Sequence, residues 1–130
     1  MSAGNEQGTG PGAGYADESP LTVRVDRTQE RVAVCHVAGD LDIESLAPAQ
    51  ESLSALVEQG TPVVVVDLSG VGFCDSSGLN LLLKTRAAAL AAGVDFRLAA
   101  VAPTVRRVLD LTGAQAVFTV FDSVDAALAA

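Results

Sequence analysis

Hydrophobic residues change their spacing several times along the chain, and each spacing predicts a different element. Apolar and polar side chains alternate over residues 21–25, which is the period of a half-buried strand, whereas residues 32–37 are apolar at nearly every position. A short polar turn from Asp26 to Arg31 separates these two strands, so we expect a hairpin. The four consecutive valines of Val63–Val66 predict a third strand that is covered on both faces.

Apolar residues at helical intervals predict two helices, one on each side of the valine strand. Ser45 is the expected N-cap of the first helix, which ends at Gly60. A glycine-punctuated loop from residue 67 leads to the second helix, which begins near Ser77 and ends at Gly93. The buried stripe of this second helix is expected to comprise Leu79, Leu82, Leu83 and Leu90.

Two further pairs of strand and helix complete the chain. Residues 95–101 predict a short strand, and Pro103 begins a helix, a position where proline is tolerated. Residues 117–121 predict the final strand, and Asp122 or Ser123 caps a last helix. The inward-facing residues of the helix that begins at Pro103 are expected to be Val105, Val108, Leu109 and Leu111.

The resulting order of elements, β-β-α-β-α-β-α-β-α, predicts an α/β fold. Alternating strands and helices require a mixed, largely parallel sheet of about five strands with about four helices, in which the first hairpin supplies an antiparallel edge. Residues 1–20 are rich in glycine and proline and have almost no large apolar side chain, so we expect a disordered tail. The folded domain then comprises residues 21–130, which is long enough for one hydrophobic core.

Charge and composition argue against several classes of function. Sixteen acidic residues against eight basic ones give a net charge of −8, which opposes phosphate backbones and anionic lipid. We therefore expect no direct binding of nucleic acid and no association with a membrane. Without a secretory signal or an apolar stretch of membrane length, the chain is expected to be cytoplasmic, with Cys35 and Cys74 reduced.

Groups suited to catalysis are few. The only histidine, His36, lies in an apolar strand, and the serine-rich segment contains no Gly-x-Ser-x-Gly elbow, Walker loop or dinucleotide fingerprint. We therefore expect a protein that is not an enzyme and needs no cofactor. Asp40, Asp67 and Asp75 are carboxylates of the kind that bind metals, but no spacing motif supports a metal site.

The sequence Asp75-Ser76-Ser77-Gly78 at the start of the second helix allows two interpretations. Aspartate and serine accept hydrogen bonds from the free backbone amides of a first helical turn, so the segment serves as a helix cap. A hydroxyl group at this place is also suited to carry a covalent phosphate, because the helix dipole and free amides stabilise negative charge.

Several separated motifs resemble those of STAS domains of the bacterial anti-sigma factor antagonist type. The segment from Val65 to Leu79 is similar to the signature of that family, and Gly39-Asp40-Leu41-Asp42 is similar to the turn after its second strand. Residues 103–113 and 121–128 resemble its two closing elements. The resemblance covers roughly Leu21 to Ala130 and implies a STAS-like fold.

The resemblance implies a regulatory protein that acts by partner switching. In that family an unphosphorylated antagonist binds an anti-sigma factor that is also a serine kinase, and phosphorylation of one serine, here Ser76, ends the interaction. Two residues depart from the family pattern: Cys74 replaces an aliphatic residue, and Asn80 stands where glycine or alanine is usual and could alter partner choice. We expect a monomer or weak dimer whose partner-binding residues are Asp40, Asp42, Asp75, Ser76, Ser77, Gly78 and Asn80.

Two other functions are compatible with the residues. The chain could be a nucleotide-binding or scaffold STAS module, because backbone amides near Ser76 could hold a phosphate, although no group that reads a base is evident. A receiver-like protein that accepts a phosphoryl group on Asp67 is a further alternative. That chemistry needs paired acidic residues after the first strand and a lysine late in the fold, whereas the only lysine is Lys84 in the second helix.

Overall fold

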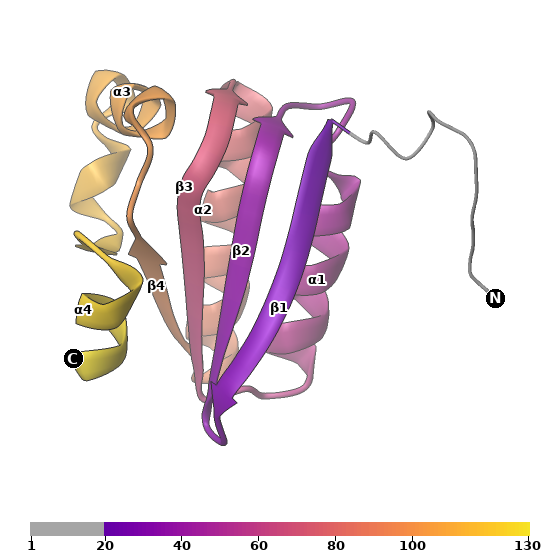
Figure 1. Cartoon of the computed structure of the whole chain (residues 1–130), viewed down its shortest axis with the longest axis vertical. Coiled ribbons are helices and arrows are strands. Elements are labelled where there is room, and N and C mark those ends of the chain that lie inside the picture. Colours follow the sequence, from indigo (N-terminus) through magenta and orange to yellow (C-terminus); the bar gives the residue numbers. More distant parts are fainter. Residues whose placement is uncertain (1–19) are drawn as a thin grey trace, which may run out of the picture.

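The computed structural model describes residues 20–130, which form a five-stranded sheet and four α-helices (Figure 1). The expected tail, residues 1–20, lies outside this part except for Pro20. The strands are β1 (Leu21–Gln29), β2 (Val32–Leu41), β3 (Val63–Cys74), β4 (Asp95–Ala99) and β5 (Thr119–Phe121). The helices are α1 (Ala47–Glu58), α2 (Ser76–Ala92), α3 (Pro103–Thr112) and α4 (Val124–Ala129), with a 3-10 turn η1 (Ala114–Ala116) after α3.

The order of strands in the sheet follows the order in the chain, β1-β2-β3-β4-β5. β1 pairs with β2 in antiparallel fashion, and each later neighbouring pair is parallel. The predicted mixed, largely parallel sheet with an antiparallel hairpin at its edge is therefore confirmed. Parallel pairing also brings the carboxyl ends of β2 and β3 to one edge, where the loops that lead into α1 and α2 begin.

Helices cover the two faces of the sheet unequally. α1, α2 and α3 pack on one face, where side chains such as Leu53, Leu82 and Val105 form the larger hydrophobic core. On the other face α4 contacts β3, β4 and β5, and Val65 and Ala127 belong to a smaller core. Among the helices of residues 20–130, none lies over β1 and β2 on that second face (Figure 1). No helix within residues 20–130 has the length and apolar character that crossing a membrane requires.

β3 continues through the segment that the sequence predicted to be a loop after residue 66. His36 pairs with Asp67 and Ala38 with Gly70, so β3 carries one more residue than β2 over this interval. The register slips again before Phe73, which is the partner of Asp40. The glycine-rich stretch is thus a strand with two irregularities, and glycine is common at such bulges. The prediction of a loop was wrong because glycine spacing alone does not separate a loop from a bulged strand.

The start of α1 also differs from the sequence prediction. Leu46, not Ser45, is the N-cap residue, and its side chain makes no capping hydrogen bond. Asp42 instead stabilises the approach to the helix, because its Oδ1 atom accepts a hydrogen bond from the Ser45 amide at 3.0 Å. The carboxylate acts from the preceding turn, whereas the N-cap prediction assumed a serine side chain.

Two leucines that were predicted to face inward are exposed. Leu90 is 64% exposed and Leu111 is 75% exposed. Ala89 takes the buried position in the last turns of α2, and the next residue is rotated by about 100° away from that face. In α3 the buried residues are Val105 and Leu109, which leaves Leu111 on the outer side.

The ends of the last strands are shorter than predicted. β4 stops at Ala99 because Ala100 has a φ angle of +52°, a left-handed conformation that breaks the strand. Val117 follows the η1 turn and lies outside β5. Ser123 caps α4 as expected, because its Oγ atom accepts a hydrogen bond from the Ala126 amide at 3.0 Å.

Candidate functional site

Asp75 is the N-cap residue of α2 and has an extended backbone conformation. Its Oδ1 atom accepts hydrogen bonds from the Ser77 amide at 2.9 Å and from the Gly78 amide at 3.3 Å. Two amides that the first helical turn leaves without a helical partner are thereby satisfied, and the carboxylate lies at the positive end of the helix dipole. The helix cap that the sequence allowed is therefore present.

Ser76 is the first residue of α2 and is exposed. Within residues 20–130 its hydroxyl group has no hydrogen-bond partner, whereas Ser77 is half-buried beside it. The helix begins one residue earlier than predicted, because Asp75 caps it and Ser76 already belongs to its first turn. An exposed, unengaged hydroxyl at this position is chemically available for modification by another protein.

Gly78 allows α2 to approach the end of β2 closely. A β-carbon at this position would lie 2.5 Å from the carbonyl oxygen of Leu41 and 3.0 Å from the Cys74 sulfur atom. The backbone of α2 therefore rests directly against the last residues of β2 and β3. This contact fixes the first turn of α2, and with it the position of Ser76.

Cys74 lies under this first turn and is 8% exposed, whereas its neighbour Phe73 points outward and is 50% exposed. Burial, together with the negative charge of Asp75, raises the pKa of the Cys74 thiol to about 11. Burial likewise raises the pKa of Cys35 to about 11. Both thiols are therefore protonated at neutral pH, a state that suppresses nucleophilic reactivity.

Asp40 and Asp42 come to the same sheet edge as the start of α2. Asp40 pairs in register with Phe73, and the next pair, Leu41 with Cys74, directly precedes Asp75. The Asp75 amide donates a hydrogen bond to the Leu41 carbonyl oxygen at 3.4 Å. Asn80 is exposed in the first turns of α2, above this edge. The fold thus gathers all seven predicted partner-binding residues around one end of the sheet.

The sequence analysis missed two large apolar side chains at this edge. Ile43 is 70% exposed in the loop between β2 and α1, and Phe73 is 50% exposed at the end of β3. Exposed residues of this size beside a candidate binding site are typical of protein interfaces. The sequence contained one indication that Ile43 would be exposed: it lies in a polar turn, outside any predicted strand or helix whose apolar face could be buried.

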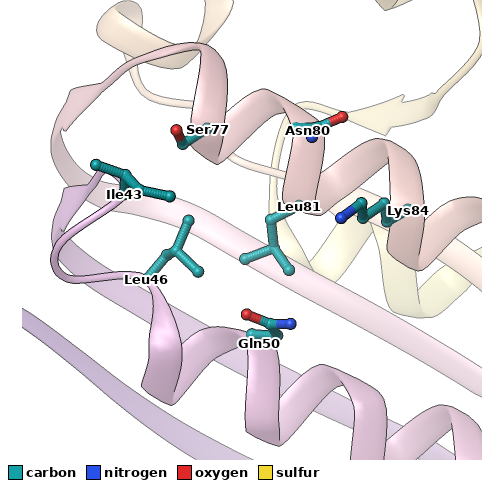
Figure 2. Close-up of a pocket in the computed structure, with 7 residues that line it drawn as sticks. All are labelled: Ile43, Leu46, Gln50, Ser77, Asn80, Leu81 and Lys84. Atoms are coloured by element: carbon teal, nitrogen blue, oxygen red, sulfur yellow. The ribbon is translucent and has the colours of Figure 1, made fainter.

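A shallow pocket of about 140 Å³ lies between α1 and α2 next to this edge (Figure 2). Leu46 and Leu81 point toward one another across it, and Ser77 lies at the end nearest the loop. The sequence did not reveal this pocket, because its residues come from two helices that only the fold brings together. Its complete lining is Ile43, Leu46, Gln50, Ser77, Asn80, Leu81 and Lys84.

His36 and Asp67 make a side-chain hydrogen bond on the sheet face that also carries α4. The Nδ1 atom of His36 lies 2.7 Å from Oδ2 of Asp67, and Oδ1 of Asp67 accepts a hydrogen bond from the Ser69 amide at 3.0 Å. Burial tends to raise the pKa of Asp67, but the hydrogen bonds from Ser69 and His36 outweigh it and lower that pKa. Both carboxylate oxygens are thus engaged, which is unfavourable for an acceptor of a phosphoryl group.

The three aspartates considered as metal ligands do not come together. Within residues 20–130 no group of three or more histidine, cysteine, aspartate or glutamate side chains is arranged to hold a metal ion. Asp67 pairs with His36 in the middle of β3, whereas the Asp75 carboxylate is committed to the cap of α2.

Comparison with known proteins gives consistent matches. The model of the STAS domain family matches residues 24–127. The anti-sigma-F factor antagonist RsfB of Mycobacterium tuberculosis is 31% identical over 97 residues, which is 75% of this chain and 79% of RsfB. A crystal structure of an anti-sigma factor antagonist from Mycobacterium paratuberculosis has a TM-score of 0.75 and 33% identity, and the match covers 86% of this chain and 94% of that one.

A more distant structure, the anti-sigma factor antagonist SpoIIAA in its unphosphorylated form, has 21% identity and a TM-score of 0.69. That match covers 82% of this chain and 93% of SpoIIAA, and it supports the fold alone. The mixed sheet and the capped start of α2 define an α/β domain of the class to which these regulatory proteins belong. The chain is a member of the STAS domain family.

Proposed function

We propose that this protein is a cytoplasmic anti-sigma factor antagonist that binds an anti-sigma factor with serine kinase activity. Phosphorylation of Ser76 by that kinase then ends the interaction between the two proteins. The observation that carries the proposal is the exposed Ser76 hydroxyl, without a partner within residues 20–130, at the first turn of a helix whose start is fixed by Asp75 and Gly78. The names of the relatives, antagonists of anti-sigma factors, support the choice of partner.

The surface around Ser76 is suited to a protein partner. Exposed Ile43 and Phe73 offer apolar contact area at the same sheet edge. The half-buried Asp40 and Asp42 lie at that edge too, because Asp40 pairs with Phe73 and Asp42 directly precedes Ile43. Apolar side chains surrounded by polar groups are the usual composition of the core and rim of an interface.

Phosphorylation would change the charge of this surface more than its shape. A phosphate on Ser76 adds about −1.5 to −2 charge at neutral pH. It would lie beside the Asp75 carboxylate, which already accepts the Ser77 and Gly78 amides. The helix dipole makes the added charge tolerable within the antagonist, whereas an apposed partner must desolvate it. We therefore expect release by local exclusion, without a large conformational change.

The test uses three variants and the anti-sigma factor kinases of the host. Ser76→Ala should bind the partner and lose phosphorylation, whereas Ser76→Glu should fold normally and bind at least roughly tenfold more weakly, or about 1.4 kcal/mol. Ser77→Ala is the matched control and should still be phosphorylated. Calorimetric titration gives the affinities, mass spectrometry maps the phosphate, and circular dichroism checks the fold.

Three results would contradict the proposal. They are phosphate found on Ser77 alone, undiminished binding by Ser76→Glu, and phosphorylation or ATP hydrolysis by the isolated chain without a kinase.

A further inference from the structure

The pocket between α1 and α2 is continuous with the surface proposed for the partner. Ser77 and Asn80, which the sequence analysis placed among the partner-binding residues, line it together with Ile43. Figure 2 shows Leu46 and Leu81 facing one another at its centre. We call the five remaining lining residues the anchor pocket: Ile43, Leu46, Gln50, Leu81 and Lys84.

The size of the anchor pocket indicates what it can hold. Sites for small molecules and cofactors usually have volumes of roughly 300–1,000 Å³. The cavity here has about 140 Å³ and opens to solvent, which is too small to enclose a nucleotide. Its apolar centre, formed by Leu46 and Leu81, instead matches a single aliphatic side chain of another protein.

The charge at the rim indicates what accompanies that side chain. Lys84 is the only lysine of the chain, is exposed, and has no ion-pair or hydrogen-bond partner within residues 20–130. Figure 2 shows its amine directed back toward Leu81. In a protein of net charge −8, an unpaired cation at the edge of an apolar pocket is complementary to a carboxylate.

We propose that the anchor pocket receives an aliphatic side chain of the anti-sigma factor, flanked by a carboxylate that pairs with Lys84. This inference rests on the proposed function, because it assigns a contact to the same partner. The anchor pocket extends the interface from Ser76 across α2 to α1. An aliphatic anchor supplies affinity by burial, and the Lys84 pair favours partners with an acidic residue at the matching position.

The test measures binding of the anti-sigma factor kinase that phosphorylates Ser76. Ile43→Ala and Lys84→Glu should each weaken binding at least roughly tenfold, and the loss caused by Lys84→Glu should diminish as salt is raised. Leu90→Ala is the matched apolar control, because Leu90 is 64% exposed and Ile43 is 70% exposed. Arg106→Glu is the matched charge control on α3, and both controls should bind within about twofold of the wild type.

A third variant tests the pocket by filling it rather than by removing one of its side chains. Gln50 is exposed, so Gln50→Phe should fold normally while its ring occupies the cavity and weakens binding. Circular dichroism verifies the fold of every variant.

The outcomes separate the two proposals. If the wild type neither binds nor is phosphorylated by any host anti-sigma factor kinase, the proposed function and the anchor pocket are both rejected. If the wild type binds and Ile43→Ala, Lys84→Glu and Gln50→Phe bind equally well, only the anchor pocket is rejected.

Discussion

At the scale of single residues, the absence of a side chain at Gly78 has the largest structural consequence at the site. Gly78→Ala should lower the free energy of unfolding by about 1–3 kcal/mol, because the new methyl group meets the Leu41 carbonyl oxygen and forces a backbone shift. Gly72→Ala is the control, since a β-carbon there meets no atom within 4 Å. Urea unfolding of both variants measures the difference. Equal midpoints would show that the contact between α2 and β2 is not close in solution.

The Asp67–His36 pair predicts a dependence of stability on pH. The pKa of Asp67 is lowered in the folded protein, so the ionised carboxylate stabilises the fold above the unfolded pKa of about 4. That contribution is lost as the pH falls through the folded pKa. Asp67→Asn should therefore cost about 1 kcal/mol at neutral pH, because a charged hydrogen bond becomes a neutral one.

Unfolding of Asp67→Asn and the wild type from pH 7 to pH 2 tests this dependence. The two free energies of unfolding should converge at the acidic end, and Asp26→Asn serves as the control for an exposed pair with Arg24. A difference that stays constant over the whole range would exclude linkage through Asp67.

The sequence could identify site residues whose role depends on adjacent residues, such as a helix cap. It could not identify residues whose role depends on contacts with segments that are distant in the chain. Asp75 and Ser76 stand directly before the leucines at helical spacing, and aspartate and serine are common at helix starts, so the cap could be predicted from the local sequence. Leu46 is the N-cap residue of α1, and Leu81 was not among the leucines predicted for the buried stripe of α2, so nothing local in the sequence marked either as part of a pocket. Ser45 was misassigned as a cap because Asp42, three residues earlier, supplies the acceptor.

At the scale of elements, the start of α2 combines a stabilising cap with a candidate binding surface, and two substitutions separate these roles. Asp75→Ala should cost about 1 kcal/mol of stability, because two amides lose their acceptor. Asp75→Asn keeps a capping oxygen and should cost much less. If the partner recognises the negative charge, both variants should bind more weakly.

Thermal unfolding and calorimetric titration of both variants provide the comparison. Ser123→Ala removes the corresponding cap of α4 and should reduce stability without affecting partner affinity. Full affinity and a normal phosphorylation rate in Asp75→Ala would reject a role of Asp75 in binding.

The existence of each main element was predictable from spacing, whereas the end of β3 was not. Val64, Val65 and Val66 are buried, as expected of a central strand. Beyond them the strand continues only because β2 offers backbone partners through two register irregularities. Such pairing depends on a second strand that is distant in sequence, and hydrophobic periodicity contains no information about it.

At the scale of the whole molecule, the beginning of the folded domain can be located by truncation. Removal of residues 1–18 should leave the melting temperature and partner affinity nearly unchanged, because Pro20 and Leu21 are retained. Removal of residues 1–21 should be clearly destabilising. It deletes Leu21, which is 1% exposed, and the Pro20 carbonyl oxygen that accepts a hydrogen bond from the Asp40 amide at 2.8 Å. Burial of a leucine side chain is worth about 1.5–3 kcal/mol.

Differential scanning calorimetry of the two truncated proteins decides the point. A large fall in melting temperature for the shorter truncation would show that residues before Ser19 contribute to the fold.

The overall topology was predictable because alternating strands and helices leave few ways to arrange a parallel sheet. The unequal covering of the sheet by the helices of residues 20–130 could not be predicted in this way, because it depends on the short final helix packing on β3, β4 and β5.

The hydrogen bond between Asp40 and Pro20 has a practical consequence for binding measurements. It places the entry to the domain at the edge that carries Asp42 and the start of α2, whereas Ala130 lies toward the opposite end of the strands (Figure 1). In the protein that lacks residues 1–18, an affinity tag or sensor-surface linkage at the amino terminus would lie next to the region where we propose that the partner docks. Immobilisation through the carboxyl terminus keeps the support away from that region, so apparent affinities should be weaker with amino-terminal attachment.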